Sequence, residues 1–219
     1  MDCMQGMKEF PDKYFDLAIV DPPYGRNEHG GRNRSGYVRQ KNGSKIFVKD
    51  GQYKNRNWDN EPPSEDYFNE LIRVSKNQII WGANHFISKI PYDSSCWIVW
   101  DKDNTGNFAD CELAWTSFDS AVRKFKYRWN GMLQENMKNK ESRMHPTQKP
   151  VALYEWLLNR YAKPNDIILD THVGSASSLI ACYNTNHKFV GFELDEYYYK
   201  VSKQRLDTEM AQMRLSDFM

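Results

Sequence analysis

Short apolar runs alternate with stretches of helical periodicity along most of this 219-residue chain. Runs of strand length, rich in branched and aromatic side chains, occupy residues 15–20, 78–82, 96–100, 111–116, 167–170 and 189–193. Helices are expected after Ser64, after Pro150, over residues 175–183 and from Glu196 to Arg205. Because strands that alternate with helices form βαβ units, the sequence predicts an α/β fold with a doubly wound, mainly parallel sheet.

The length of the chain suits one α/β domain with a sizeable core, and we expect a single domain over residues 1–219. No apolar run approaches the roughly 18–20 residues that span a bilayer, and no signal-peptide pattern is present, so a cytoplasmic protein is expected. The four cysteines are widely separated and form no C-x-x-C pair, which favours reduced, mostly buried thiols over a disulfide framework. Neither they nor the histidines have the spacing of a metal site.

Basic residues are concentrated in two segments, although the net charge of the chain is only +1. Residues 26–57 hold nine lysines and arginines against two acids, and residues 119–144 hold seven against three, which leaves a net −10 on the remainder. The first segment is polar, has interleaved aromatic side chains and shows no helical period, so a long loop or hairpin is expected there. Segment 26–57 is a candidate for contact with nucleic-acid phosphates and for sequence reading, with an ordinary solvated loop as the alternative, and segment 119–144 is a second candidate for nucleic-acid contact.

The run at residues 15–20 ends at Asp21-Pro22-Pro23-Tyr24, where two consecutive prolines must stop the strand. An ordinary β-turn explains this pattern as well. A chemical interpretation is that Asp21 and a carbonyl of the proline pair accept the two N–H bonds of an exocyclic nucleobase amine. Such an amine is a poor nucleophile, and these acceptors would draw its nitrogen towards a tetrahedral geometry. Tyr24 would offer a flat face to an extruded base.

A second turn follows the run at residues 167–170, where small residues open a helix and allow a ligand to approach the backbone. Glu193 lies nineteen residues after Gly174 and at the end of the next strand, the spacing of an acid that binds ribose hydroxyls. The turn has a single glycine and is preceded by Asp170. This favours a cationic methyl donor over a dinucleotide, because a carboxylate repels a pyrophosphate.

In this order, the Asp-Pro-Pro-Tyr turn, the segment His145-Pro146-Thr147-Gln148-Lys149-Pro150, the small-residue turn and Glu193 resemble the β-class of bacterial and phage DNA amino-methyltransferases. The resemblance extends from Asp2 to about Arg205, and the motif order is circularly permuted, with the catalytic half first. It implies a Rossmann-like sheet of the class I methyltransferases, S-adenosylmethionine as methyl donor, and a flipped adenine or cytosine as acceptor.

By resemblance, the catalytic residues are Asp21, Pro22, Pro23 and Tyr24. The residues expected to bind the donor are Asp2, Cys3, Thr147, Lys149, Asp170, Thr171, His172, Gly174, Ser175, Ala176, Ser177, Glu193 and Asp195. Among them, Lys149 is expected to pair with the donor's carboxylate, and Asp2 with Cys3 to lie beside its adenine.

The turn departs from the family pattern Asp-Pro-Phe-x-Gly-Ser-Gly-Thr in two ways. His172 replaces an aromatic side chain against the donor, and Ala176 replaces the second glycine, which is expected to restrict the backbone. The family also has a short strand before the Asp-Cys pair, so residues upstream of Met1 are expected.

The predicted function is transfer of a methyl group to N6 of adenine in double-stranded DNA, because aspartate in the first position of the catalytic motif is commoner in the adenine enzymes. An N4-cytosine enzyme, an enzyme acting on RNA or a small molecule, and a non-catalytic DNA-binding module remain alternatives. The resemblance further implies a homodimer and a cognate restriction endonuclease in a restriction-modification system.

Overall fold

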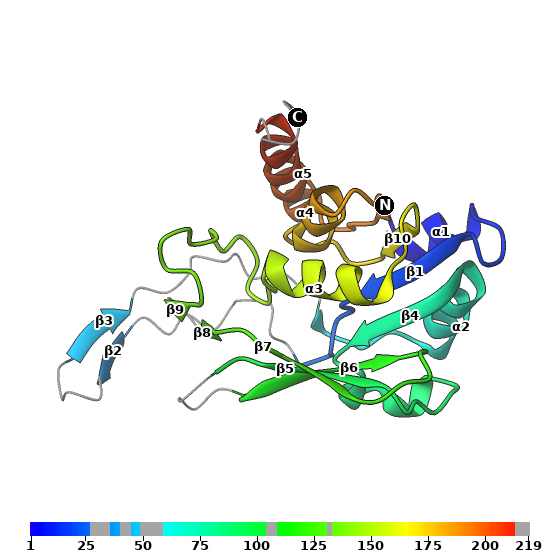
Figure 1. Ribbon diagram of the computed structural model, residues 1–219, viewed down its shortest axis with the longest axis horizontal. Helices are drawn as coiled ribbons and strands as arrows, with labels where there is room; N and C mark the ends of the chain where they lie inside the picture. The colour runs from blue at the N-terminus through cyan, green and yellow to red at the C-terminus, as the bar shows by residue number, and fades with distance from the viewer. Residues whose placement is uncertain (27–35, 40–44, 49–58, 104–108, 131–132, 213–219) are drawn as a thin grey trace.

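The computed structural model describes residues 1–26, 36–39, 45–48, 59–103, 109–130 and 133–212 (Figure 1). Its centre is a seven-stranded sheet in the order β11-β10-β1-β4-β6-β5-β7. These strands are β1 (Phe15–Val20), β4 (Ser75–Trp81), β5 (Trp97–Asp101), β6 (Cys111–Thr116), β7 (Arg123–Lys126), β10 (Ile167–Asp170) and β11 (Lys188–Gly191). All neighbouring pairs are parallel except the two that β6 makes with β4 and β5.

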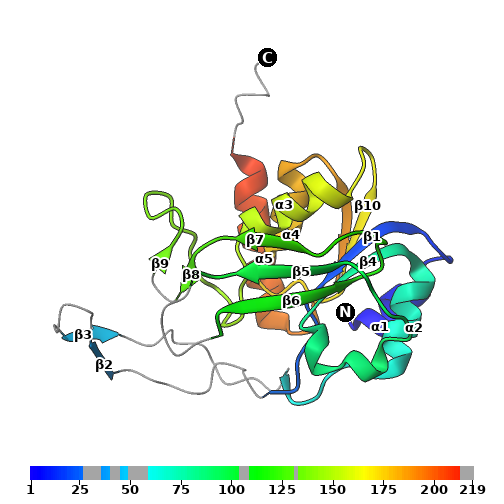
Figure 2. The same ribbon diagram turned by 60° about the horizontal axis from the view of Figure 1, so that its bottom comes forward.

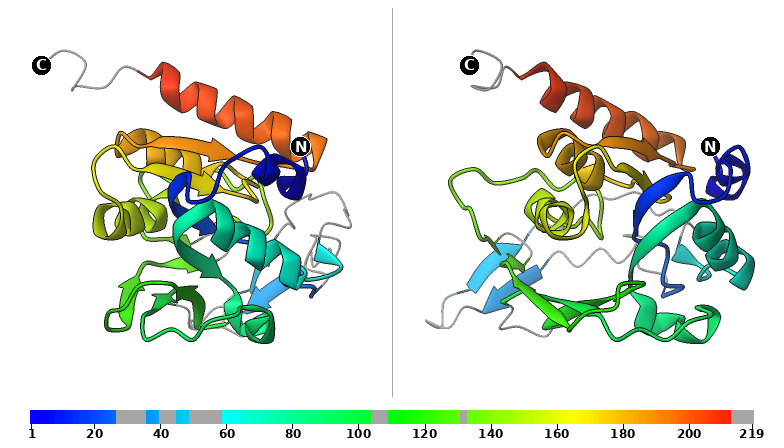
Figure 3. Two further views of the ribbon diagram at one scale, coloured as in Figure 1. Left: turned by 90° about the vertical axis from the view of Figure 1, so that its right-hand side faces the viewer. Right: turned by 45° about the vertical axis from the view of Figure 1, so that its right-hand side comes forward.

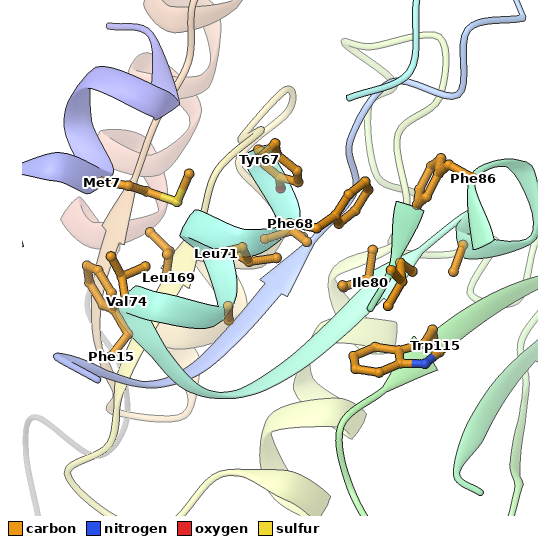
Figure 4. Packing of buried hydrophobic residues seen from close by; sticks show 14 of the residues in the cluster. Met7, Phe15, Tyr67, Phe68, Leu71, Val74, Ile80, Phe86, Trp115 and Leu169 are labelled. Atoms are coloured by element: carbon orange, nitrogen blue, oxygen red, sulfur yellow. The ribbon is translucent and has the colours of Figure 1, made fainter. Parts of the chain in front are cut away.

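Helices cover both faces of this sheet. Helices α1 (Cys3–Lys8) and α2 (Glu65–Val74) pack on one face, and α3 (Val151–Tyr161) and α4 (Ser177–Asn184) on the other, while α5 (Glu196–Ala211) packs against α4 (Figure 1). From Leu17 to Val20, alternate β1 residues supply the two cores, with Ala18 and Val20 on the α2 side and Leu17 and Ile19 on the α3 side. Figure 4 shows the first core closing around Phe68 and Leu71. The predicted doubly wound α/β fold is therefore confirmed.

The buried run of β1 forms the middle of the parallel part of the sheet. Val20 pairs with Ile80 of β4 on one side, and Ala18 pairs with Leu169 of β10 on the other. The chain therefore leaves β1 towards β4 and returns much later to β10, so the strand order reverses at β1. Ligands of open α/β sheets bind at such a reversal, beyond the carboxyl ends of the strands.

Two small hairpins lie outside the main sheet. Strands β2 (Gly36–Arg39) and β3 (Lys45–Val48) are antiparallel and project from the body of the protein, as the two views in Figures 1 and 2 agree. They confirm a hairpin within segment 26–57. Strands β8 (Trp129–Asn130) and β9 (Leu133–Gln134) form the second hairpin, and short 3₁₀ turns at Ala83–His85 and Ile87–Lys89 follow β4. No helix in the described ranges is long and apolar enough to cross a membrane.

The helices differ from the sequence expectation in several places, and α5 extends to Ala211 rather than ending at Arg205. Helix α4 begins at Ser177 rather than at Ser175, because Gly174 and Ala176 both adopt positive φ, which interrupts helical geometry. Helix α1 was not expected. It begins because the carboxylate of Asp2 accepts hydrogen bonds from the backbone N–H groups of Met4 and Gln5. Figure 3 shows the N-terminus beside the start of α5, where the Met1 ammonium donates to the Glu193 carbonyl at 2.7 Å.

The four thiols are free, as predicted, but they are less buried than expected. Cys96 and Cys182 are buried, whereas Cys3 is half-buried and Cys111 is exposed.

Candidate active site

A cavity of about 560 Å³ lies at the carboxyl ends of β1, β10 and β11. Both predicted halves of the site contribute to its wall. Of the residues predicted from sequence, those in the lining are Asp2, Cys3, Asp21, Pro23, Thr147, Lys149, Thr171, His172, Gly174, Ser175, Ser177, Glu193 and Asp195. Pro22, Tyr24, Asp170 and Ala176 are not part of this lining. The fold therefore brings together two turns that are about 150 residues apart, because β1 and β10 are neighbours in the sheet.

Asp21 follows β1 directly and has a largely buried side chain, 16% exposed. Its carboxylate accepts a hydrogen bond from the Tyr24 hydroxyl at 2.7 Å. The other carboxylate oxygen forms an ion pair with the Lys149 ammonium at 2.5 Å. Burial raises the pKa of Asp21 above its usual range, and the nearby Lys149 charge opposes that rise. Asp21 is thus an oriented acceptor at the edge of the cavity.

Tyr24 is held by three contacts. Its ring stacks on the His85 ring at 4.9 Å, and its hydroxyl is bound to Asp21. Gly82, at φ +69°, passes so close that a Cβ there would lie 2.0 Å from the ring. Only glycine fits this place, both for the left-handed backbone and for the contact. The His85 imidazole therefore covers one face of the ring that the sequence predicted as a base-stacking surface.

Asp59 fixes the backbone of the same turn, and it was not among the residues predicted for the site. Its buried carboxylate accepts hydrogen bonds from the backbone N–H groups of Tyr24 at 2.7 Å and Gly25 at 2.9 Å. The sequence carries no spacing signal for this contact, because thirty-five residues separate Asp59 from Tyr24. The two prolines of this turn have no N–H and cannot form regular backbone hydrogen bonds. The Asp59 carboxylate instead holds the turn by accepting from the next two N–H groups.

Replacing Asp59 with alanine should leave both N–H groups without their acceptor and loosen the turn that carries Asp21 and Tyr24. We expect the free energy of unfolding to fall by about 2 kcal/mol, the typical cost of stranding buried donors. Asp59→Asn keeps an acceptor oxygen of the same shape and should lose much less. Urea denaturation of the two variants measures the difference; equal losses would show that the carboxylate does not hold the turn.

Lys149 has a different environment from the one expected. Its side chain is 2% exposed and its ammonium contacts the carboxylates of Asp21 and Glu112, the latter at 3.0 Å. It also lies 3.3 Å from the Tyr24 hydroxyl. Glu112, on β6, was not predicted as a site residue. The described structure thus places Lys149 against carboxylates of the chain, whereas the sequence analysis assigned it to the carboxylate of the donor.

Glu193 joins the turns after β10 and β11. One of its carboxylate oxygens accepts from the Gly174 N–H and the other from the Asp195 N–H, both at 2.8 Å. Asp195 in turn caps α5 by accepting from the N–H groups of Tyr197 and Tyr198. Because each carboxylate oxygen can accept a second hydrogen bond, Glu193 still has acceptor capacity for hydroxyl groups of a ligand in the cavity.

Asp170 does not line the cavity. Its carboxyl group accepts from the backbone N–H of His172 at 2.9 Å and from the hydroxyl of Ser178. Burial raises its pKa to about 7, so the group carries less negative charge than the sequence analysis supposed. The structure gives Asp170 a part in shaping the turn rather than a position against a ligand.

Ala176 lies where the family pattern has its second glycine, and it adopts the left-handed conformation, with φ +62°. For an alanine this backbone conformation costs roughly 1–2 kcal/mol. The Ala176 side chain is completely buried against Val173 and Leu179.

Two histidines of the cavity are neutral at physiological pH. Burial lowers the pKa of His145 to about 3 and that of His172 to about 4. A hydroxyl group lies within hydrogen-bonding distance of each ring: His145 Nδ1 is 3.0 Å from the Thr147 hydroxyl and His172 Nδ1 is 2.9 Å from that of Thr171. His145 Nδ1 also lies 3.4 Å from the backbone N–H of Thr147. A cation entering the cavity therefore meets no positive imidazole.

These lowered pKa values predict acid sensitivity. Between pH 6.5, the ordinary histidine value, and about pH 4, the unfolded chain binds two protons at these histidines that the folded chain refuses. The raised pKa of Asp170 acts in the opposite sense, with one proton that only the folded chain retains. The two histidines should therefore make the free energy of unfolding fall as the pH drops from 6.5 towards 4, against the opposite contributions of Asp170 and of the other carboxyl groups with raised pKa, Asp21, Glu141 and Glu193. His172→Phe should reduce that slope in denaturation curves; an unchanged slope would refute the assignment.

The basic segment 119–144 is partly neutralised by nearby acids. Lys124 lies 3.4 Å from Asp101, and Asp103 pairs with both Lys126, at 2.8 Å, and Arg128. These side chains line β7, the edge strand of the sheet, where charges also discourage pairing with another chain. Segment 26–57 lies mostly outside the described residues.

Comparison with known proteins agrees with this geometry. The model of the DNA methylase family of N6 and N4 enzymes matches residues 99–204. Over 94% of the chain and 87% of the relative, the sequence is 25% identical to the putative methylase YubD of Escherichia coli.

Solved structures share the fold over nearly the whole chain. A putative DNA modification methylase from Thermus thermophilus, complexed with S-adenosyl-L-methionine, superposes with a TM-score of 0.56 at 16% identity, covering 97% of this chain and 95% of that one. The PvuII DNA methyltransferase, described as cytosine-N4-specific, superposes with a TM-score of 0.57 at 12% identity, covering 96% and 88%. The resemblance to the DNA amino-methyltransferases and the class I methyltransferase fold are thereby confirmed.

Proposed function

We propose that this chain transfers the methyl group of S-adenosylmethionine to N6 of a flipped adenine in double-stranded DNA. One observation carries the proposal. Asp21 and Pro23 line the same cavity as Gly174 and Glu193, so a methyl donor bound by the second pair would lie beside the acceptors of the first. The methyl-transfer resemblance, confirmed over most of the chain, supports this interpretation.

The charge of the cavity favours a sulfonium donor over a diphosphate. Its wall contains more acids than cations, and both histidines are neutral. The lining acids are Asp2, Asp21, Glu193, Asp195 and Glu196, against Lys149 and the N-terminal ammonium of Met1. An excess of carboxylates attracts the sulfonium and ammonium groups of S-adenosylmethionine and repels phosphates.

The ribose of the donor is proposed to bind Glu193, whose position is fixed by the Gly174 and Asp195 N–H groups. Thr171, His172 and Ser175 would form the wall around the rest of the donor. The side chains that meet its adenine are proposed to be Asp2 and Cys3, because the N-terminus of α1 faces the same cavity.

The acceptor amine is proposed to bind between Asp21 and a carbonyl of the proline pair. Asp21 accepts one N–H, the carbonyl accepts the other, and the nitrogen lone pair is turned towards the sulfonium methyl. As the N–C bond forms, the methyl–sulfur bond would break and S-adenosylhomocysteine would leave, and the product amine would lose its extra proton to solvent or to an acceptor in the site. Since His85 covers one face of Tyr24, an extruded base would replace this imidazole or use the other face of the ring.

DNA contact is proposed for segments 26–57 and 119–144. The β2–β3 hairpin projects from the body of the protein and could extend along bound DNA. The lysines and arginines of both segments would attract the DNA phosphates. A homodimer and a cognate endonuclease are proposed from the resemblance alone, and the single-domain organisation over residues 1–219 is proposed from the length of the chain.

The test is a methylation assay with isotopically labelled S-adenosylmethionine and duplex DNA, followed by nucleoside chromatography. Label in N6-methyladenine supports the proposal, and label in N4-methylcytosine assigns the alternative acceptor. DNA that is bound but carries no label would favour a non-catalytic DNA-binding module. RNA and free nucleosides as competing substrates separate the remaining alternative.

A further inference from the structure

A buried ion-pair network continues from Asp21 away from the cavity. Lys149 bridges Asp21, at 2.5 Å, and Glu112, at 3.0 Å, and Glu112 is also paired with Lys102. These four residues come from four parts of the fold: the end of β1, the segment before α3, β6, and the residue after β5. The network thus crosses four neighbouring strands and ends on the candidate catalytic carboxylate.

The position of Lys149 is tightly determined. Its side chain is 2% exposed, and its ammonium lies 5.4 Å from the centre of the Trp81 ring and 5.8 Å from that of Tyr24. A charge held among such groups cannot be solvated by water, so its carboxylate partners must balance it. Burial lowers the pKa of Lys149, but Asp21 and Glu112 raise it above its usual value, so the ammonium stays protonated.

The charge state of Asp21 matters for the proposed reaction. Only an ionised carboxylate is purely an acceptor, and a protonated one would present an O–H to the amine that it should hold. Burial favours the protonated form, the Lys149 ammonium favours the ionised form, and Glu112 favours the protonated form again. The balance therefore depends on how Lys149 is shared between two carboxylates.

We propose that Lys149 is a positioning residue that keeps Asp21 charged and oriented towards the acceptor amine, and that Glu112 is a second positioning residue that holds Lys149. The inference deepens the proposed function and rests on it. It gives Lys149 a role that differs from pairing with the carboxylate of the donor, and it gives Glu112 a role in the same site.

Other ionisable groups also face Asp21. Tyr24 donates to it, and its remaining neighbours of this kind come from α2, α3 and β10: Tyr67, Tyr154 and Asp170. Burial raises the pKa of all three tyrosines well above its usual value, so they stay neutral in the working range. Lys149 is therefore the cation that directly balances Asp21 among the described residues.

The first measurement needs no turnover. The side-chain carboxyl of Asp21 is titrated by carbon-13 NMR in the wild type, Lys149→Met and Glu112→Gln, using Asp21→Asn to assign the signal. Lys149→Met should raise the Asp21 pKa, because it removes a positive charge. Glu112→Gln should lower it, because the amide oxygen can still accept from Lys149 and hold it in place while a negative charge is removed. A purely structural role predicts no such opposite pair. Shifts of the same sign, or no shifts, would overturn the inference.

The second measurement is single-turnover methyl transfer against pH. The acid limb of the rate should move to higher pH in Lys149→Met and to lower pH in Glu112→Gln. In Lys149→Met, the rate on the plateau should also fall by on the order of 100-fold, the usual cost of misplacing a reacting group by about 1 Å. Lys76→Met removes an exposed lysine paired with Asp16 at the other end of β1, and it should change neither quantity.

Donor binding decides between the two roles of Lys149. Calorimetry should show nearly the same affinity of Lys149→Met and wild type for S-adenosylhomocysteine, which has the same carboxylate as the methyl donor. A large loss of affinity with an unchanged Asp21 titration would return Lys149 to the donor carboxylate. Thermal melting identifies a variant that fails to fold, and Glu112→Gln, which preserves shape, then carries the test. If the wild type transfers no methyl group, the proposed function fails while the NMR titration still tests the network.

Discussion

Replacing Asp21 with alanine is expected to abolish methyl transfer to DNA. The carboxylate is the side chain placed to accept an N–H of the acceptor amine, and its loss also removes the partner of the Tyr24 hydroxyl and of Lys149. Losing one preorganised group that stabilises developing charge typically costs on the order of 10²–10³-fold in rate. Because Asp21 both orients the amine and balances a buried lysine, we expect a loss at or beyond the upper end of that range.

The measurement is the single-turnover rate with saturating donor and DNA. Asp21→Asn is the matched variant, since it keeps the size and one acceptor oxygen but replaces the other by an N–H donor. It should retain more activity than Asp21→Ala. DNA affinity, measured by fluorescence anisotropy, should survive in both variants. Turnover of Asp21→Ala at the wild-type rate would show that this turn is structural.

Replacing Glu193 with alanine is expected to weaken binding of the methyl donor. Hydrogen bonds to a charged group contribute about 1.5–3 kcal/mol each, and a loss of this size raises the dissociation constant by roughly 10–100-fold. The same change removes the acceptor that holds the Gly174 N–H, so the turn beneath the donor should loosen as well.

Isothermal titration with S-adenosylmethionine measures this effect. Glu193→Gln keeps two hydrogen-bonding atoms but no charge, and it should fall between the alanine variant and the wild type. Asp207→Ala is a control on α5 outside this cavity, because that side chain is 57% exposed and paired with Lys203. Equal affinity of Glu193→Ala and wild type would remove Glu193 from the donor site.

The two roles proposed for the acids of this site follow from their surroundings. Asp21 lies among buried aromatic groups and one lysine, which makes its protonation state adjustable. Burial also raises the pKa of Glu193, but its two backbone N–H contacts oppose that rise and leave an acceptor for neutral hydroxyl groups. Asp170 is fully buried, and no cation among the described residues lowers its pKa, so it keeps its proton up to about pH 7. Its hydrogen bonds to His172 and Ser178 shape the turn after β10.

Much of the fold was predictable because its signals are local. These signals are the apolar runs of strand length, the helix starts after Ser64 and Pro150, and the proline pair after β1. Each of them depends only on residues that are close together in the sequence. The site could also be located in part, because the acid after β11 and the small residues after β10 have a fixed separation in nucleotide-binding α/β folds. The motif order then supplied the resemblance that the comparisons confirmed.

The partners of the site residues were not predictable in the same way. Asp59, Glu112 and His85 contact Tyr24 or Lys149 across 35 or more residues of sequence, and no periodicity connects such positions. The left-handed backbone of Ala176 contradicts its own residue preference and is imposed by the turn around it. Interactions of this kind depend on which strands become neighbours.

The sequence by itself determined that β1 and β10 end in turns of unusual composition, because strand length and proline geometry are properties of the local chain. Only the tertiary structure decided that Lys149 meets Asp21. That contact exists because β4 lies between β1 and β6, and the segment before α3 passes the carboxyl ends of β1 and β4 and the amino end of the antiparallel β6. Burial then removes the water that would separate these charges, so a lysine and two carboxylates become one coupled unit.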